Sequence, residues 1–317
     1  MTSEITLFVN PTAGRGRGAR AALPAASALR AAGHDVRTVV GETAADALAR
    51  ARAAVADGTG ALIAVGGDGL AHLALQAVAG TRVPLGLIAV GTGNDLARAL
   101  GLPVRDPEAA GRVVADALRE GRLRDLDLGH AEPTASAPGT VAGTGPGGPG
   151  ADGGRWFGSV LASGFDSRVN DRGNRMRWPA GRLRYDLAVL AELAAFRPFP
   201  YRITLDDGTV RETEATLVAV GNGPSYGGGM RICPGADPAD GLFDVTVVGD
   251  CSRRTLLRVF PRVYRGTHVT HPKVTVHRAA KVVLAADGIT GYADGERLGP
   301  LPLTVRCVPG AVRVLGP

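Results

Sequence analysis

A four-residue turn at 66–69, Gly-Gly-Asp-Gly, combines bare backbone with a single carboxylate. The apolar residues 61–65 before it predict a buried parallel strand, and residues 70–78 after it predict a helix. Glycines between a strand and a helix let backbone N–H groups approach a phosphate, and the helix N-terminus adds partial positive charge. The carboxylate of Asp68 would repel that phosphate unless a cation or a sugar hydroxyl lay between them. The turn therefore indicates a nucleotide with a metal ion, although a plain strand-to-helix turn with positive-φ glycines is the alternative.

Two further strand–loop–helix units carry similar loops. Residues 85–90 predict a strand that leads into a Gly-Thr-Gly loop at 91–93, and a helix follows. Residues 5–9 predict the first strand, and the loop at 10–18 contains three glycines before an Ala-rich helix begins. In a doubly wound sheet, the loops after successive strands open at one edge, where ligands bind. Three such loops predict a ligand site at that edge.

Five sequence blocks, spread over nearly the whole chain, occur in a characteristic order. They are Asn10-Pro11-x-Ala13-Gly14, Gly66-Gly67-Asp68-Gly69, Gly91-Thr92-x-Asn94-Asp95-Leu96-Ala97-Arg98, a group that runs from Asn222-Gly223 through Tyr226-Gly227-Gly228-Gly229-Met230 to Asp240-Gly241-Leu242-Phe243-Asp244, and Asp294-Gly295-Glu296. In these blocks and their spacing the chain resembles the diacylglycerol/sphingosine lipid kinase family. A single glycine motif would be weak evidence, whereas five blocks in order are specific.

The resemblance implies an α/β N-terminal nucleotide-binding domain with a parallel sheet and a C-terminal β-sandwich-like (α+β) domain, with the active site in the cleft between them. The residue pattern agrees, because strands alternate with Ala-rich helices at first and strand-like segments predominate later. We predict an ATP-binding kinase domain over 1–127 and a β-rich lipid-substrate domain over 128–317. A Gly- and Pro-rich loop at 132–154 is predicted to be disordered. Predicted strands of the second domain cover 156–162, 201–205, 214–220, 243–248, 281–285, 303–307 and 312–315, and predicted helices cover 180–196 and 252–262.

Phosphoryl transfer requires a phosphate cradle, charge neutralisation by Mg²⁺ and a group that accepts the hydroxyl proton. For the active-site Mg²⁺ we predict Asp68 as the ligand, with Asp95 as a weaker candidate. Asp95 or Asn94 is equally suited to cap the helix that begins there. The residues predicted to bind the nucleotide are Asn10, Gly14, Gly66, Gly67, Asp68, Gly69, Gly91, Thr92 and Asn94.

The proton acceptor is predicted from the last block. The resemblance places a catalytic carboxylate at Glu296, so the catalytic residues expected are Glu296 and Asp68. Asp-Gly at 294–295 is also typical of a hairpin turn, which is the structural alternative.

A second acidic cluster lies at Asp237, Asp240 and Asp244. Oxygen ligands at these spacings suit a hard cation, and the resemblance implies a structural Mg²⁺ at Asp237 and Asp240. An exposed acidic turn would have the same composition, and both interpretations stay open.

The activity predicted is an ATP- and Mg²⁺-dependent transfer of phosphate to a hydroxyl of diacylglycerol or a related lipid such as a sphingoid base or ceramide. Leu70, His72 and Leu73 differ from the residues of many bacterial members, so the acceptor lipid stays open. An NAD kinase-like phosphotransferase is the alternative enzyme, and a non-catalytic lipid- or nucleotide-sensing homologue is the alternative without turnover. We expect His72 to be a partly buried helix residue.

Charge and composition bear on the partners. The net charge of +6 favours an anionic surface, and because no nucleic-acid motif accompanies it we expect a membrane and no nucleic acid. Three well-separated cysteines predict free thiols, and no apolar run reaches the ~18 residues of a spanning helix. We therefore expect a cytoplasmic protein that associates peripherally with the inner face of the membrane, with homodimer formation left open. The predicted lipid-approach segment is rich in arginine beside Trp178, with Arg168, Arg172, Arg175, Arg177, Arg182 and Arg184.

Overall fold

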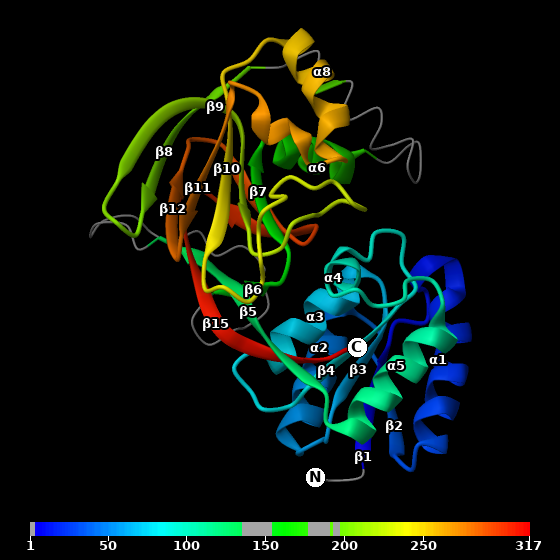
Figure 1. The fold of residues 1–317 in the computed structure, drawn as a ribbon. Helices are drawn as coiled ribbons and strands as arrows, with labels where there is room; N and C mark the ends of the chain where they lie inside the picture. The colour runs from blue at the N-terminus through cyan, green and yellow to red at the C-terminus, as the bar shows by residue number, and fades with distance from the viewer. Residues whose placement is uncertain (1–3, 135–153, 177–190, 193–196) are drawn as a thin grey trace.

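The computed structural model describes residues 4–134, 154–176, 191–192 and 197–317. Its first domain is a parallel sheet between two layers of helices (Figure 1). Helices α1 and α5 pack on one face, and α2 and α3 pack on the other. The elements are β1 (Glu4–Val9), α1 (Ala13–Ala31), β2 (Asp35–Val40), α2 (Ala44–Ala56), β3 (Leu62–Gly66), α3 (Asp68–Val78), β4 (Leu85–Ala89), α4 (Asp95–Ala99) and α5 (Pro107–Glu120).

Local sequence signals set several helix ends in this domain. The Thr43 hydroxyl accepts the Asp46 N–H at the start of α2, and the Asp106 carboxylate accepts the Ala109 N–H at the start of α5. The helix α1 begins at Ala13, inside the segment predicted as a loop, although Gly14 and Gly16 retain positive φ there.

The second domain is built mainly from antiparallel strands, in the order β14-β13-β7-β9-β8-β12-β15. In addition, β10 pairs with β9 and β11 with β10, while β5 pairs with β15 and β6 with β5. The predicted fold class, an α/β domain followed by a β-sandwich-like domain, is confirmed. The elements are β5 (Leu123–Pro133), β6 (Arg155–Phe157), β7 (Val160–Gly164), α6 (Phe165–Arg175), β8 (Phe199–Leu205), β9 (Val210–Gly221), β10 (Phe243–Gly249), α8 (Arg253–Val263), η1 (Thr267–Thr270), β11 (Val274–Ala279), β12 (Lys281–Ala285), β13 (Thr290–Ala293), β14 (Glu296–Pro300) and β15 (Leu303–Leu315).

Several predicted elements differ from the structure in their limits. The predicted strand 156–162 is two strands, because the chain turns at 158–159. The predicted strands 303–307 and 312–315 form the single strand β15, which continues through a bulge. The strands β11, β13 and β14 and the helix α6 were not predicted, whereas α8 confirms the helix predicted at 252–262.

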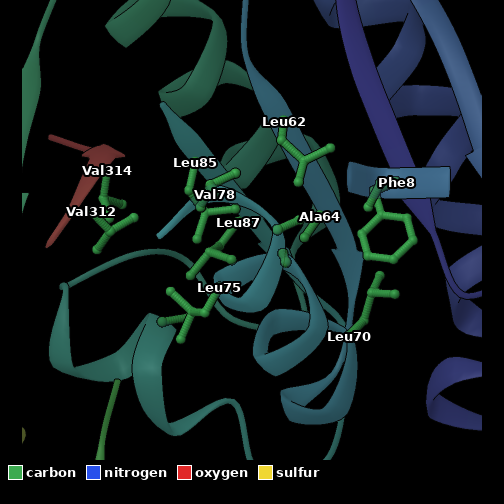
Figure 2. Packing of buried hydrophobic residues seen from close by; sticks show 14 of the residues in the cluster. Phe8, Leu62, Ala64, Leu70, Leu75, Val78, Leu85, Leu87, Val312 and Val314 are labelled. Carbon is green, nitrogen blue, oxygen red and sulfur yellow. The ribbon is translucent and has the colours of Figure 1, made fainter. Parts of the chain in front are cut away.

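The last strand joins the two domains. Along most of its length β15 pairs antiparallel with β5, and near its end Val314 pairs parallel with Leu85 of β4. Val312 and Val314 pack beside Val78 and Leu85 in the core of the first domain (Figure 2). The C-terminal residues therefore pack in the core of the first domain, although the predicted boundary at 127 assigns them to the second domain.

Two predictions fall largely on residues outside the described ranges. Most of the loop predicted at 132–154, residues 135–153, lies outside the described residues, and its first residues belong to β5, which ends at Pro133. The helix predicted at 180–196 is described at 191–192 alone. The three cysteines are buried free thiols, as predicted. Among the described helices, none combines the length and apolarity needed to cross a bilayer.

Candidate active site

The loops after β1, β3 and β4 meet at the carboxyl edge of the parallel sheet. Asn10 follows β1, and its N–H donates to the carbonyl of Val65 at the end of β3. The loops of Gly67 and Gly91 touch so closely that a Cβ added at Gly91 would lie 2.6 Å from the Cα of Gly67. Glycine is required here because two backbones pass each other without room for a side chain. The structure therefore brings the three predicted loops together.

Asp68 connects two of these loops through its carboxylate. One oxygen accepts the Asn94 N–H at 2.8 Å, and the other accepts the Asp95 N–H at 2.9 Å. Asn94 occupies the left-handed region at φ 60°, and its buried Oδ1 has no hydrogen-bond partner among the described residues. Thr92, in the same loop, is exposed. Asp68 thus fixes the start of α4 against the start of α3.

Asp95 joins the first domain to the second. Its carboxylate accepts the N–H groups of Gly228 and Gly229, each at 2.8 Å. Both glycines have positive φ, which turns their N–H groups toward one carboxylate. Burial raises the pKa of Asp95, and these two N–H donors oppose the shift. The side chain of Asp95 does not cap α4 and neither does that of Asn94, so the capping alternative is wrong for both.

Glu296 reaches the glycine turn from the second domain. Asp294 and Gly295 have positive φ, 52° and 87°, and make the tight turn between β13 and β14 that the sequence offered as the structural alternative. Glu296 is exposed, and its Oε1 would lie 3.4 Å from a Cβ added at Gly69. A carboxylate from the second domain therefore faces the first turn of α3.

Asp294, to which the sequence assigned no role, holds this turn in place. Its carboxylate accepts the N–H groups of Gly158, Ser159 and Val160 at 2.8 to 3.3 Å. His72 lies on α3, where it was predicted to be partly buried; its ring is almost fully buried, and its Nδ1 lies 3.9 Å from Asp294 Oδ2. The break between β6 and β7 thus positions the turn that carries Glu296.

Gln76, one helical turn after His72, also joins the domains. Its Nε2 donates to the Trp156 carbonyl at 2.7 Å, and its Oε1 accepts the Trp156 N–H at 3.0 Å. A side-chain amide that completes the pairing of a strand residue carries no sequence signal, since it depends on two elements 80 residues apart. Helix α3 is therefore tied to the second domain at Gln76.

We expect Gln76→Leu to lower the free energy of unfolding by about 1–3 kcal/mol, because it leaves the Trp156 N–H and carbonyl without partners. Gln76→Glu keeps the acceptor for the N–H and loses the donor, so its loss should be smaller. Urea unfolding of the three proteins measures the effect. Equal stability of Gln76→Leu and the unaltered protein would show that the contact between Gln76 and Trp156 does not stabilise the fold.

The acidic residues at 237–244 have partners within the protein. Asp240 makes an ion pair with Arg278, and Asp237 accepts the Ala239 N–H. Burial raises the pKa of Asp244, whose Oδ1 lies 3.5 Å from Arg278 Nε. Within the described ranges, no three His, Cys, Asp or Glu residues are grouped to hold a metal ion. A structural Mg²⁺ at Asp237 and Asp240 stays a prediction.

Asp127, in β5, connects the acidic segment at 237–244 to β15. Its carboxylate accepts the N–H groups of Gly241 and Gly310, at 2.7 and 2.9 Å, and its own N–H donates to the Pro238 carbonyl. Asn222, from the quoted Asn-Gly block, is buried and donates from Nδ2 to the carbonyls of Asp127 and Gly158. These contacts thus hold β5, β15 and the acidic segment of the second domain together.

Comparison with known proteins decides the family. The model of the diacylglycerol kinase catalytic domain matches residues 4–131, and the model of the YegS C-terminal NAD kinase beta sandwich-like domain matches residues 159–316. A diacylglycerol kinase of Mycobacterium tuberculosis (strain H37Rv) is 45% identical over 314 residues, which cover 99% of this chain and 95% of that protein.

The chain belongs to the diacylglycerol kinase family. Its family resemblance, predicted from the five sequence blocks, is thereby confirmed, and the protein is a lipid kinase, a transferase. A diacylglycerol kinase of Bacillus subtilis is 27% identical, with 93% of this chain and 90% of that protein covered. A crystal structure of a diacylglycerol kinase from Bacillus anthracis has a TM-score of 0.71 at 22% identity, covers 99% of this chain and 97% of that chain, and shares the fold.

In this lipid kinase, Gly93 gives a direct test of the loop geometry. A Cβ at Gly93 would lie 2.5 Å from Asp68 Oδ2. Gly93→Ala should therefore displace the Asp68 carboxylate and lower kcat by roughly 10²-fold, the usual effect of a displacement of about 1 Å in an active site. Kinase assays on the purified variant measure it.

Gly111→Ala in α5 is the matched control, because a Cβ there makes ordinary contacts at 3.7 Å. It should keep full activity and, as a glycine replaced inside a helix, gain up to about 1 kcal/mol of stability. A Gly93→Ala protein as active as the Gly111→Ala control would contradict the prediction that kcat depends on the position of the Asp68 carboxylate.

Proposed function

We propose that this lipid kinase transfers the γ-phosphate of ATP, with Mg²⁺, to a hydroxyl of diacylglycerol or a related lipid. The observation that carries the proposal is the position of Glu296 against Gly69. A carboxylate from the second domain, without a partner in the described part of the chain, lies there beside a glycine turn that opens a helix of the first domain. This is the arrangement that a proton acceptor and a phosphate cradle need, because the reacting hydroxyl must lie between them.

The residues at the edge of the sheet fit ATP and Mg²⁺. Gly67 and Gly91 leave no side chain between the loops, and the buried Asn94 Oδ1 is an acceptor without a partner among the described residues. Each oxygen of Asp68 accepts a single N–H in the structure, so each keeps a lone pair. Mg²⁺ in kinases is bound by one or two carboxylates together with substrate phosphates, so Asp68 suffices as the protein ligand.

Each part of the site then has one task. The N–H groups of the turn at 66–69 and the start of α3 would bind phosphate oxygens. Asn10, Gly14, Gly91, Thr92 and Asn94 would complete the cradle. Glu296 would accept the proton of the lipid hydroxyl as the hydroxyl oxygen attacks the γ-phosphate of ATP and ADP leaves. Mg²⁺, held by Asp68, supplies positive charge for the β- and γ-phosphate oxygens when bound.

The lipid acceptor implies a protein that works at a membrane surface. We place it in the cytoplasm, peripherally associated with the inner face of the membrane, and the net charge of +6 supports contact with anionic lipid. Homodimer formation stays a prediction.

Transfer of labelled γ-phosphate from ATP to a panel of acceptors tests the proposal. Diacylglycerol, ceramide, sphingosine, phosphatidylglycerol and NAD should be offered separately, each with Mg²⁺ and with a chelator. We expect Mg²⁺-dependent labelling of at least one lipid. Labelling of NAD alone would support an NAD kinase-like enzyme, and a folded protein that binds ATP without labelling any acceptor would be a sensor.

A further inference from the structure

The helix α8 of the second domain has one packed side and one side that no described residue covers. Val259 and Val263 are buried, and Leu256 is partly buried. Leu257, Phe260 and Tyr264 are 58%, 40% and 51% exposed. Their spacing of three and four residues places them on one side of the helix, and the rings of Phe260 and Tyr264 contact each other edge to face. The apolar stripe of α8 is therefore turned outward.

Arginines lie along one flank of the apolar stripe and at its N-terminal end. α8 contains no acidic residue, and none of its exposed guanidinium groups pairs with a carboxylate in the described part of the chain. The exposed arginines are Arg253, Arg254, Arg258 and Arg262 of α8 and Arg265 just after it. An exposed apolar stripe beside unpaired cations is the composition of a helix that lies in the interface of an anionic bilayer.

The lipid-approach segment predicted from the sequence, at 168–184, does not include α8. Arg168 and Arg172 both pair with the buried carboxylate of Glu192, so one of their two charges is neutralised within the protein. The side chains of Arg175, Arg177, Arg182 and Arg184 are outside the described residues. The unpaired basic face that the structure describes is that of α8.

We infer that the outward face of α8 docks on the surface of an anionic lipid bilayer, an inference that rests on the proposed lipid kinase function. A second copy of the chain fits this face poorly, because it would bring two sets of five arginines together. An anionic headgroup layer complements the arginines and takes up the three apolar side chains.

The docking face is connected to the site through α6. Leu256 of α8 packs against Phe165 and Val169 of α6, and the two helices lie together at the end of the second domain farther from the first (Figure 1). Asp171 of α6 accepts the hydroxyl of Tyr292 at 2.6 Å, and Tyr292 lies in β13, two residues before the turn of Glu296. Docking at α8 would thus orient the half of the molecule that carries the proposed proton acceptor.

Sedimentation of the full-length protein with vesicles tests this inference. Vesicles of phosphatidylcholine containing phosphatidylglycerol are compared with phosphatidylcholine alone, in the absence of ATP. We expect binding to the anionic vesicles and a loss of about tenfold or more for Arg254→Glu with Arg258→Glu, from roughly fivefold per charge near the surface. Phe260→Ser should lose roughly tenfold through the lost burial of its ring.

A matched control lies on α1 of the first domain, where Arg20 and Leu23 are exposed. Arg20→Glu with Leu23→Ser should bind vesicles like the unaltered protein. Kinase activity of every variant on lipid dissolved in neutral detergent should be unchanged, which also shows that the variants fold.

The two proposals fail in different ways. If the α8 variants bind vesicles like the unaltered protein and keep their activity in detergent, α8 is not the docking face. The proposed kinase function is then unaffected. A change of oligomeric state in light scattering by the α8 variants, without a change in vesicle binding, would assign the face to a second copy and also overturn the inference. Loss of vesicle binding in the α8 variants of a protein that labels no lipid would support the docking face and reject the kinase.

Discussion

Glu296→Gln is expected to lower kcat by about 10²–10⁴-fold, the usual contribution of a general base. The amide keeps the size and shape of the side chain beside Gly69 but does not take up a proton at neutral pH. ATP binding should be unchanged, because the predicted cradle belongs to the first domain. Single-turnover transfer to lipid, together with the Kd for ATP, separates the two effects.

Glu212→Gln is the control for this substitution. Glu212 lies on β9 of the same domain, its side chain is 72% exposed, and it pairs with Arg202 on the surface. It should leave kcat and stability as they are, since exposed ion pairs contribute little. A Glu296→Gln protein that turns over as fast as the Glu212→Gln control would remove the proton acceptor from the mechanism.

Asp68→Asn is expected to reduce both activity and stability. An asparagine offers one acceptor oxygen, so its NH₂ group would face the N–H of Asn94 or Asp95. We expect a loss of about 1–3 kcal/mol in the free energy of unfolding from the unpaired donor. We also expect roughly a 10²–10³-fold fall in kcat from the lost charge at the phosphates.

Urea unfolding and Mg²⁺-dependent kinase assays measure the two losses separately. Asp57→Asn is the control, because Asp57 is 62% exposed and pairs with Arg37 at the surface of the same domain. A loss of stability with normal, Mg²⁺-dependent turnover would make Asp68 a purely structural connection between the loops.

The sequence was sufficient for the fold class and for the three loops. Buried strands followed by glycine turns have a periodicity and composition that few other structures share, and the loops of parallel strands open at the same edge. Two of the loops meet at Gly67 and Gly91, where a side chain would collide with backbone. The glycines of both loops are visible in the sequence, although the contact that requires them is not.

The contacts that join the domains and hold the Glu296 turn could not be predicted from the sequence. Asp95 was weighed as a helix cap or a metal ligand, and in the structure it accepts the N–H groups of Gly228 and Gly229, a contact that was not predicted. Gln76 and Asp294 received no role, although each bonds to backbone near the break between β6 and β7. These contacts join residues more than 75 positions apart, and no spacing along the chain encodes them.

The exposed face of α8 could have been suspected from the sequence. Leu257, Phe260 and Tyr264 follow helical spacing, but the same spacing is typical of a core stripe. The structure decides between the two, because it buries Val259 and Val263 on a neighbouring side of the helix and leaves the first set exposed.

One reaction tests the central claim, the transfer of phosphate to a lipid hydroxyl, most directly. Diacylglycerol in neutral detergent micelles and NAD are offered together to the full-length protein with γ-labelled ATP and Mg²⁺, and the label is then partitioned between chloroform and water. Our account predicts Mg²⁺-dependent label in the chloroform phase as phosphorylated lipid, and its loss in the Glu296→Gln protein. Label that enters NAD while the chloroform phase stays unlabelled would contradict it.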